Sequence, residues 1–305
     1  MDWLMYVVSA LLLVGAGLAL WMVFVEPTRF RVWRVSLPGT EDRSPGEVAL
    51  RAGRISPLRI LHITDTHFGT RDSAKLDFAR RVAREPCDLV FLTGDLIDVA
   101  EGIEPCLEMV EMLHPRFGIY AVLGGHDHFR GTDVVHKYTS LRDPGPPPED
   151  RREPNPVERF RRGLVERGVE VLADESRIIQ PPGKSELAIV GLRDAFVFDC
   201  DYDAAWEEVP ENAPTVVLAH SPDSLEEIAR RGADLAFFGH THGGQVRLPL
   251  IGAVVTRSKL EASRARGIFR EGETVFTLNH GMGAGIGSDF RFLCRPEVTL
   301  MKVEG

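Results

Sequence analysis

The sequence predicts an α/β protein preceded by one membrane-spanning helix at its N-terminus. Two patterns lead to this prediction. An uncharged apolar run occupies residues 3–25, and further along the chain apolar runs of five to seven residues alternate with segments of helical spacing. Such alternation is typical of βαβ units with a largely buried sheet. A third pattern, Asp and His residues directly after the strands, indicates where a functional site would form.

The first element, residues 3–25, is expected to be a transmembrane anchor. These 23 uncharged residues would span about 34 Å as a helix, and a hydrocarbon core is about 30 Å thick. A cleaved signal peptide is the alternative, but no Lys or Arg precedes the run and no small residues end it. Arg29, Arg31 and Arg34 follow. The positive-inside rule therefore predicts a single-pass inner-membrane protein with its large part in the cytoplasm.

Two further regions follow the anchor. We interpret residues 26–56 as a membrane-proximal arm and connection, with a short exposed strand from Phe30 to Leu37, and residues 57–305 as one globular domain. Within that domain, residues 143–156 contain six prolines, which neither a helix nor a central strand tolerates. We interpret this segment as a solvated loop; a lid beside a site is the alternative.

The strands of the globular domain are expected where short apolar runs occur, and the helices where apolar residues recur three or four apart. The predicted strands are residues 58–64, 88–93, 117–123, 169–173, 176–180, 187–191, 215–219, 234–238, 274–278 and 297–303. The predicted helices are residues 72–84, 102–114, 157–167 and 223–231. No internal repeat and no further domain boundary is visible in the sequence.

The composition excludes several classes of protein. The 305 residues include 36 Lys and Arg against 45 Asp and Glu, a net charge of −9, and 44% are hydrophobic. We expect no binding to nucleic acid, because that relies on Lys and Arg neutralising phosphates. The four cysteines are far apart and form no CxxC pair, which excludes a disulfide-rich scaffold and the usual structural zinc sites.

Five of the predicted strands end in Asp or His residues. The residues at these ends are Asp65, His67, Asp95, Asp98, His126, Asp127, His128, His220, His240 and His242. Ligands bind beyond the carboxyl ends of strands in open α/β sheets, so these side chains are expected to converge. Crowded carboxylates and imidazoles repel or lose solvation unless cations lie between them. Nitrogen and oxygen ligands without a thiolate suit catalytic Mn, Fe or Zn ions.

Each of these pieces has a structural explanation when taken alone. Asp98 could cap the helix that follows it, His220 could be a structural histidine, and Gly243 and Gly244 could form a turn. Five such pieces on alternating strands together favour a metal site.

The order of these motifs resembles that of the calcineurin-like metallophosphoesterases. The motifs are Asp65-x-His67, Gly94-Asp95-x-x-Asp98, Gly124-Gly125-His126-Asp127, His220 and Gly239-His240-x-His242. Residues 239–249, Gly281-Met-Gly283 and residues 295–300 are similar to the membrane-anchored or exported bacterial branch. The resemblance covers roughly residues 57–303. It implies a metallophosphoesterase catalytic domain folded as a four-layer αββα sandwich, with a two-metal site at one sheet edge.

The resemblance also implies a role for each residue. Asp65, His67 and His242 would bind one divalent ion, His220 and His240 a second, and Asp95 would bridge the two. A metal-bound hydroxide would attack the phosphorus. His126, oriented by Asp127, would stabilise the transition state or protonate the leaving oxygen, and Asp98 would position the ligands.

One position departs from the family pattern. The family usually has an Asn, which gives an oxygen ligand to the second metal, where this chain has Gly125. Water or His128 would fill that place, or the second ion would bind loosely. Asp194 and His280 also lie near predicted strand ends; we interpret them as a salt-bridge partner and a surface histidine, and contact with the substrate is the alternative for both.

The anchor narrows the expected substrate. Tethering raises the effective concentration of an amphiphile held in the same leaflet. The sequence is similar to enzymes that cleave the pyrophosphate of UDP-diacylglucosamine in lipid A synthesis, and the resemblance implies a hydrolase acting on such a phosphorylated, lipid-linked substrate. Two alternatives remain: an exported phosphodiesterase acting on envelope polymers or phospholipids, and a metal-binding scaffold without catalysis, for which Gly125 is the argument.

Overall fold

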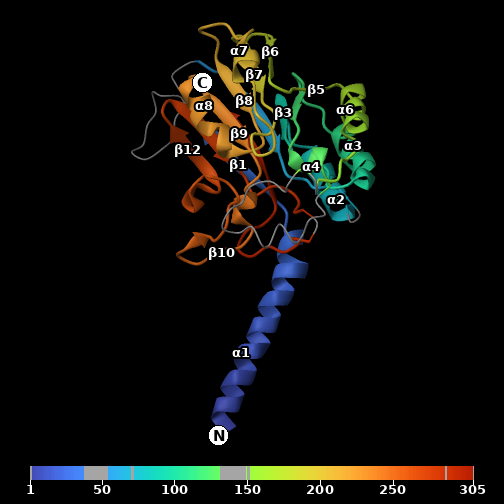
Figure 1. Cartoon of the computed structure of the whole chain (residues 1–305), viewed down its shortest axis with the longest axis vertical. Helices are drawn as coiled ribbons and strands as arrows, with labels where there is room; N and C mark the ends of the chain where they lie inside the picture. The colour runs from blue at the N-terminus through green and yellow to red at the C-terminus, as the bar shows by residue number, and fades with distance from the viewer. Residues whose placement is uncertain are drawn as a thin grey trace.

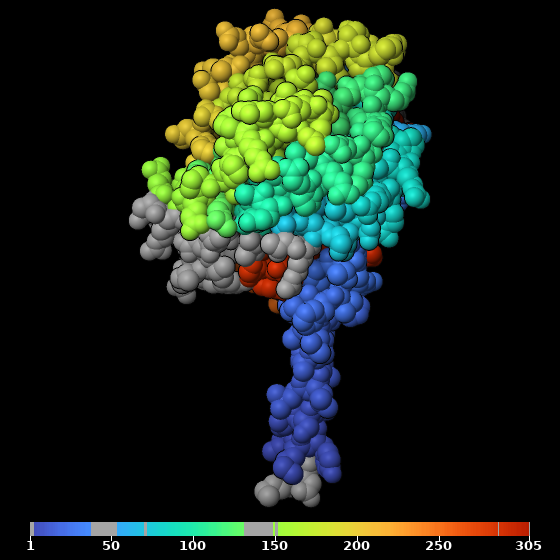
Figure 2. All heavy atoms as spheres, turned by 90° about the vertical axis from the view of Figure 1, so that its right-hand side faces the viewer, coloured from blue at the N-terminus to red at the C-terminus, as the bar shows by residue number. Residues whose placement is uncertain are grey.

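An apolar helix projects from a domain of two packed sheets in the computed structural model, which describes residues 2–37, 54–69, 72–130, 149, 152–285 and 287–304 (Figure 1). Helix α1 (Asp2–Leu20) continues through a π-helical turn, η1 (Trp21–Val25), and a 3-10 turn, η2 (Glu26–Thr28). Figure 2 shows it standing clear of the domain. By length and composition it is able to cross a membrane, as an anchor or as a signal sequence.

The end of this helix is fixed to the domain by hydrogen bonds. The buried carboxylate of Glu26 accepts from the indole N–H of Trp21 at 2.9 Å and from the backbone N–H of Cys294 at 3.1 Å. The backbone N–H of Arg291 donates to the carbonyl of Met22 at 2.9 Å. The end of the helix is therefore hydrogen-bonded to the segment 291–294 of the globular domain.

The first sheet contains six strands. Their order across the sheet is β1 (Arg31–Leu37), β14 (Glu297–Val303), β2 (Leu58–Ile63), β3 (Leu89–Thr93), β4 (Ile119–Val122) and β5 (Val169–Val171). Strands β2 to β5 are parallel, β14 is antiparallel to β2, and β1 is parallel to β14. The strand that we expected to be exposed is thus the edge strand β1. The boundaries of the arm remain a prediction, and residues 38–53 lie outside the described residues.

The second sheet also has six strands. Their order is β12 (Gly267–Glu271), β13 (Thr274–Leu278), β9 (Leu235–Phe238), β8 (Thr215–Leu218), β7 (Leu187–Gly191) and β6 (Glu175–Ile179). The four central strands are parallel and the two edge strands are antiparallel to their neighbours. A small separate hairpin is formed by β10 (Arg247–Leu248) and β11 (Gly252–Ala253).

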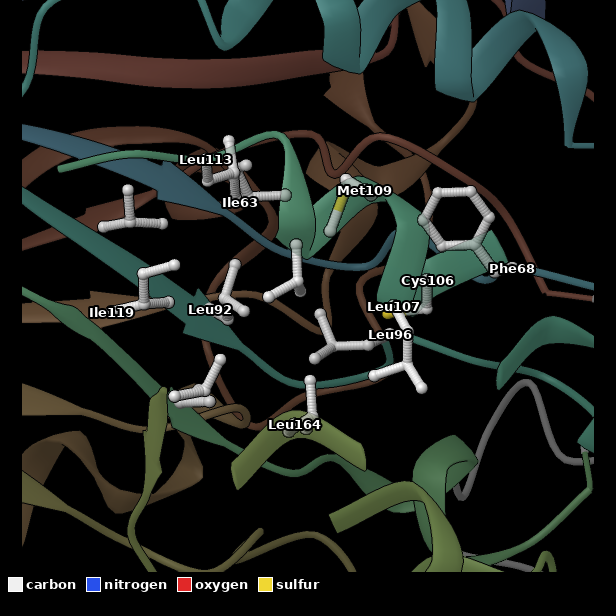
Figure 3. Close-up of a cluster of buried hydrophobic side chains, with 14 of the residues drawn as sticks. Ile63, Phe68, Leu92, Leu96, Cys106, Leu107, Met109, Leu113, Ile119 and Leu164 are labelled. Atoms are coloured by element: carbon white, nitrogen blue, oxygen red, sulfur yellow. The ribbon is translucent and has the colours of Figure 1, made fainter. Parts of the chain in front are cut away.

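Helices cover the outer face of each sheet, which gives four layers and confirms the αββα sandwich (Figure 1). On the first sheet these are α2 (Ser73–Val82), α3 (Ile103–Glu111) and α6 (Val157–Glu166). On the second they are α7 (Tyr202–Trp206) and α8 (Leu225–Arg230). Figure 3 shows side chains of the first helix–sheet layer, among them Ile63, Leu92 and Leu164.

A separate apolar core lies between the two sheets. Phe91 of β3 and Phe237 of β9 meet edge to face there, with ring centroids 5.1 Å apart, and both are fully buried. Apolar side chains on both faces of parallel strands explain why these strands read as continuous apolar runs. The contact fixes how the strand ends of one sheet lie relative to those of the other.

Replacing Phe237 with Ala is expected to lower the free energy of unfolding by about 3–5 kcal/mol, because it removes a buried aromatic ring and leaves a cavity. Urea unfolding of the detergent-solubilised full chain measures this. The matched control is Val165→Ala at an exposed position of α6, expected within about 0.5 kcal/mol of wild type. Equal unfolding midpoints for the two variants would contradict the role given to the inter-sheet core.

Candidate metal centre

The loops that follow β2, β3, β4, β8 and β9 meet at the carboxyl edge of the two sheets. They bring Asp65, His67 and His242 into a first group and Asp65, Asp95 and His220 into a second group, each with its ligand atoms within 4.8 Å of one another. Asp65 belongs to both groups. Residues that are up to 177 positions apart in sequence therefore form one cluster with Asp65 at its centre.

The first group has the geometry of one metal site. Nε2 of His242 lies 3.3 Å from Oδ1 of Asp65, and Nε2 of His67 lies 3.2 Å from Nε2 of His242. The two imidazole rings stack with centroids 5.0 Å apart. Two imidazole nitrogens and a carboxylate oxygen that face one another at these distances are a suitable donor set for a single divalent ion.

The second group contains a buried nitrogen without a hydrogen-bond partner. Nδ1 of His220 donates to the carbonyl of Thr93 at 2.7 Å, so its Nε2 is the ring nitrogen left to face the cluster. That Nε2 lies 3.1 Å from Oδ2 of Asp95, is fully buried and has no hydrogen-bond partner. A buried polar atom without a partner costs free energy, and a cation between His220 and Asp95 would remove this cost.

His240 lies beside the second group rather than within it. Its Nε2 donates to the carbonyl of Arg257 at 2.8 Å, which leaves Nδ1 as the nitrogen able to bind a metal. Its ring lies edge-on to His220, with centroids 5.4 Å apart. His67 and His220 likewise donate one ring N–H to an oxygen, on Asp98 and Thr93. This is the arrangement usual for metal-ligating histidines.

Asp98 orients two of the histidines. Its Oδ1 lies 2.7 Å from Nδ1 of His67 and 2.7 Å from Nδ1 of His126. We expected Asp127 to orient His126, and the structure differs. The Asp127 carboxylate instead accepts backbone N–H groups of Leu96, Ile97 and Gly124 at 2.8–2.9 Å. Asp127 thus joins the loop after β3 to the loop after β4.

The charges in the cluster interact strongly. Burial alone would raise the pKa of Asp95, but His220, His126 and His67 hold it well below its usual range. Burial alone would lower the pKa of His220, but Asp95 and Asp194 raise it well above its usual value. A divalent cation would take the place of the protons shared by these groups, because its ligands are carboxylates and neutral imidazoles.

The backbone of the cluster adopts an unfavourable conformation. Five of the six predicted metal ligands have positive φ angles: Asp65 (48°), His67 (44°), Asp95 (50°), His240 (67°) and His242 (48°). Such angles are uncommon outside glycine and cost about 1–3 kcal/mol each. Half of the ten non-glycine residues with positive φ in the described part of the chain are therefore predicted metal ligands.

Gly125, where the family pattern has an Asn, lies against a buried carboxylate. Its backbone N–H donates to Oδ2 of Asp194 at 2.8 Å. A Cβ atom at this position would lie 3.4 Å from that oxygen and 2.8 Å from Cγ2 of Val197, so the segment from Asp194 to Phe198 occupies space that a side chain would need. Sequence reasoning treated this site as vacant and missed the neighbouring carboxylate.

Our interpretation of Asp194 as a salt-bridge partner is wrong. Asp194 is 1% exposed and accepts only backbone N–H groups, from Gly125 and Phe196. No cationic side chain among the described residues forms an ion pair with it. A buried carboxylate without a countercharge is costly, and Asp194 acts on His220 of the second group. Asp194 is in none of the ligand groups found among the described residues, so its expected contribution to the second group is its charge.

Three other residues complete the surroundings. His128, the other candidate for the vacant place, packs its ring edge-on to Phe198, with centroids 4.8 Å apart, and is in none of the ligand groups found among the described residues. His280 is buried, which corrects our expectation of a surface histidine. Asn155 donates to the carbonyl of His126 at 2.8 Å. It belongs to the Pro-rich segment, of which residues 143–148, 150 and 151 lie outside the described residues.

Comparison with known proteins agrees with this geometry. The family model described as calcineurin-like phosphoesterase matches residues 58–244, more than half of the chain and all six predicted ligands. Phosphodiesterase YaeI of Escherichia coli is 28% identical over 289 residues, 93% of this chain and 92% of YaeI. The uncharacterized metallophosphoesterase YkoQ of Bacillus subtilis is 26% identical, covering 81% and 83% of the two chains. UDP-2,3-diacylglucosamine pyrophosphatase LpxG of Chlamydia trachomatis is 25% identical, covering 92% of both.

Replacing Asp98 with Asn is expected to weaken Mn²⁺ binding by about 10–100-fold, because both His67 and His126 lose the carboxylate that fixes their rings. Isothermal titration calorimetry on the metal-stripped, detergent-solubilised chain measures the affinity. Asp77→Asn, at an exposed position of α2, is the matched control. An unchanged Mn²⁺ affinity in the Asp98 variant would show that this carboxylate does not support the site.

Replacing Asp194 with Asn is expected to leave one Mn²⁺ per chain in place and to weaken the second by about 10–100-fold. The measurement is the Mn²⁺ content per chain at fixed free Mn²⁺. Asp199→Asn, an exposed position on the same segment, controls for the substitution. Two ions retained with wild-type affinity would rule out a role for Asp194 in holding the second ion.

Proposed function

We infer the function of this chain from two findings: it belongs to the calcineurin-like phosphoesterase family, and its candidate metal centre is joined to an apolar helix. The family makes it a hydrolase of phosphoester or pyrophosphate bonds. We propose that it acts, as a membrane-anchored enzyme, on a lipid-linked phosphorylated substrate such as UDP-diacylglucosamine. The single observation that carries the lipid substrate is the connection between the helix and the centre.

That connection passes through Arg291. Its backbone N–H binds the carbonyl of Met22 at the helix end, at 2.9 Å. Its fully buried guanidinium donates to the carbonyl of His280 at 2.8 Å and lies 3.5 Å from Nδ1 of His242. One residue thus contacts both the helix and a predicted metal ligand. If the helix spans a membrane, the centre is held close to the lipid headgroups.

We propose the following metal-binding roles for the residues of the centre. Asp65, His67 and His242 would hold one ion, His220 and His240 a second, with Asp95 between them. Bound divalent ions, for which we propose Mn²⁺, would supply Lewis-acid activation of the phosphoryl group and of water.

His126 is proposed as the proton donor to the leaving oxygen. Its side chain is 30% exposed, unlike that of His67, which is 1% exposed. It is therefore accessible to a substrate, while Asp98 fixes the position of its Nδ1.

Two relatives bear on the substrate. LpxG, by its name, acts on UDP-2,3-diacylglucosamine, a lipid-linked nucleotide sugar. YaeI is a phosphodiesterase. We propose the cytoplasmic face of the inner membrane as the location, on the basis of Arg29, Arg31 and Arg34. In the structure each of these arginines contacts a carboxylate, on Glu26, Glu297 and Glu85 respectively. We therefore use them only as a signal of orientation in the membrane and not as a binding site for lipid headgroups.

The test compares two substrates on the full chain in lipid nanodiscs with Mn²⁺: UDP-2,3-diacylglucosamine and bis(p-nitrophenyl) phosphate, a soluble diester. The proposal expects a much higher kcat/KM for the lipid. Asp95→Asn is expected to lower both rates by about 10³-fold, since several kcal/mol of transition-state stabilisation is lost, whereas Asp77→Asn retains them.

Other outcomes of this test point to the alternatives. Hydrolysis of the soluble diester alone, or of phospholipid, would replace the proposed substrate by that of a phosphodiesterase. Rates that Asp95→Asn leaves unchanged would favour the metal-binding scaffold without catalysis.

A further inference from the structure

Exposed apolar side chains outside the N-terminal helix gather at one place. Seven large hydrophobic residues beyond the helix are exposed in the described part of the chain, and five of them lie on or beside the hairpin of β10 and β11. These five are Leu248, Leu250, Ile251, Val254 and Leu293. The other two, Val165 and Ile178, lie apart on α6 and β6. Apolar residues concentrated in this way mark an interaction surface.

The tip of the hairpin holds its apolar residues away from the domain. Leu250 is 108% exposed and Ile251 is 71% exposed. Leu248 pairs with Gly252 across the hairpin, and Leu250 has a φ of 68°, an uncommon angle for a leucine. The turn therefore presents two large side chains to the surroundings at the cost of backbone strain.

The hairpin and the N-terminal helix are held by the same short segment. The backbone N–H of Arg247 donates to the carbonyl of Phe292 at 2.9 Å, while the N–H groups of Arg291 and Cys294 bind Met22 and Glu26. The hairpin and the helix are therefore both hydrogen-bonded to the same four residues, 291–294. Figure 1 shows β10 at the end of the domain from which α1 emerges.

We propose that the tip of the β10–β11 hairpin enters the interface of the bilayer that α1 spans. This rests on the proposed membrane anchoring. A bilayer is favoured over a protein partner because the apolar tip lies at the end of the domain from which the apolar helix emerges. Trp21 stands at the helix end, where indole rings favour the membrane interface.

The consequence concerns the metal centre. The hairpin begins three residues after Gly244, and Nη1 of Arg247 donates to the carbonyl of Gly243 at 2.8 Å. These residues directly follow the predicted ligand His242. With both helix and hairpin in the bilayer, the domain has two attachments and cannot swing freely about one. The candidate metal centre is then held at a fixed distance from the layer of lipid headgroups. The phosphate of a lipid-linked substrate lies in that layer.

Membrane depth of a spin label tests the proposal on the full chain in nanodiscs. Cys87 and Cys200, the partly exposed cysteines, are first replaced by serine. Single cysteines then replace Leu250, Ile178 or Leu12, and the label's accessibility to oxygen and to a water-soluble nickel complex is compared. The proposal expects a lipid environment at 250 and at 12, and water at 178.

The outcomes separate the two proposals. Water at 250 with lipid at 12 overturns the hairpin proposal and leaves the anchor intact. Water at both positions overturns the anchoring and the hairpin proposal together. A label at 250 that is shielded from both reagents, with a doubled particle mass, would indicate a second copy as the occupant and also overturns the proposal.

A kinetic measurement on variants of the hairpin tip tests the same proposal independently of the spin label. The double variant Leu250→Ser with Ile251→Ser is expected to lower kcat/KM for the lipid-linked substrate in nanodiscs on the order of fivefold, with no change for the soluble diester. The control is Val165→Ser with Ile178→Ser, which removes two exposed apolar side chains elsewhere. Equal loss with both substrates, or with the control, would contradict a role in membrane contact.

Discussion

The approach of His220 and Asp95 across the two sheets is the interaction on which the rest of this site depends. The Nε2 of His220 comes from the second sheet and Oδ2 of Asp95 from the first, and they are 3.1 Å apart. The distance is set by the core between the sheets, where Phe91 and Phe237 pack. A change in that packing would move one set of ligands against the other. The packing of the αββα sandwich therefore sets the distance between the ligand atoms of the two sheets, and this distance suits small divalent ions.

Much of the fold followed from the sequence, because buried parallel strands have a strong apolar signal. The ten predicted strands correspond to observed ones. Strand β12 was missed because it is a half-buried edge strand, although its two-residue turn at Gly272 is a hairpin signal. Helix α7 was missed because five residues are too few to show helical periodicity.

The candidate site was predicted in its residues but not in its contacts. The strand-end motifs identify which side chains converge, because topology alone brings them together. They do not identify which carboxylate meets which imidazole: Asp98, not Asp127, contacts His126. Asp194 and Arg291 belong to no motif. Their importance comes from burial, from the hydrogen bond between Asp194 and Gly125 and from the contact of Arg291 with Met22, and these are properties of the folded chain.

The positive φ angles of the predicted ligands bear on how the affinity of this centre should be read. Five residues hold backbone conformations that most side chains avoid, and contacts within the protein keep them there, such as the backbone hydrogen bonds from Asp65 and His67 to Gly94 and Asp95. The domain has therefore met the cost of preorganisation during folding rather than at the moment of capture. A divalent ion that enters the site would find its ligands already in position. The strained backbone lowers the free energy of unfolding of the domain by the same amount.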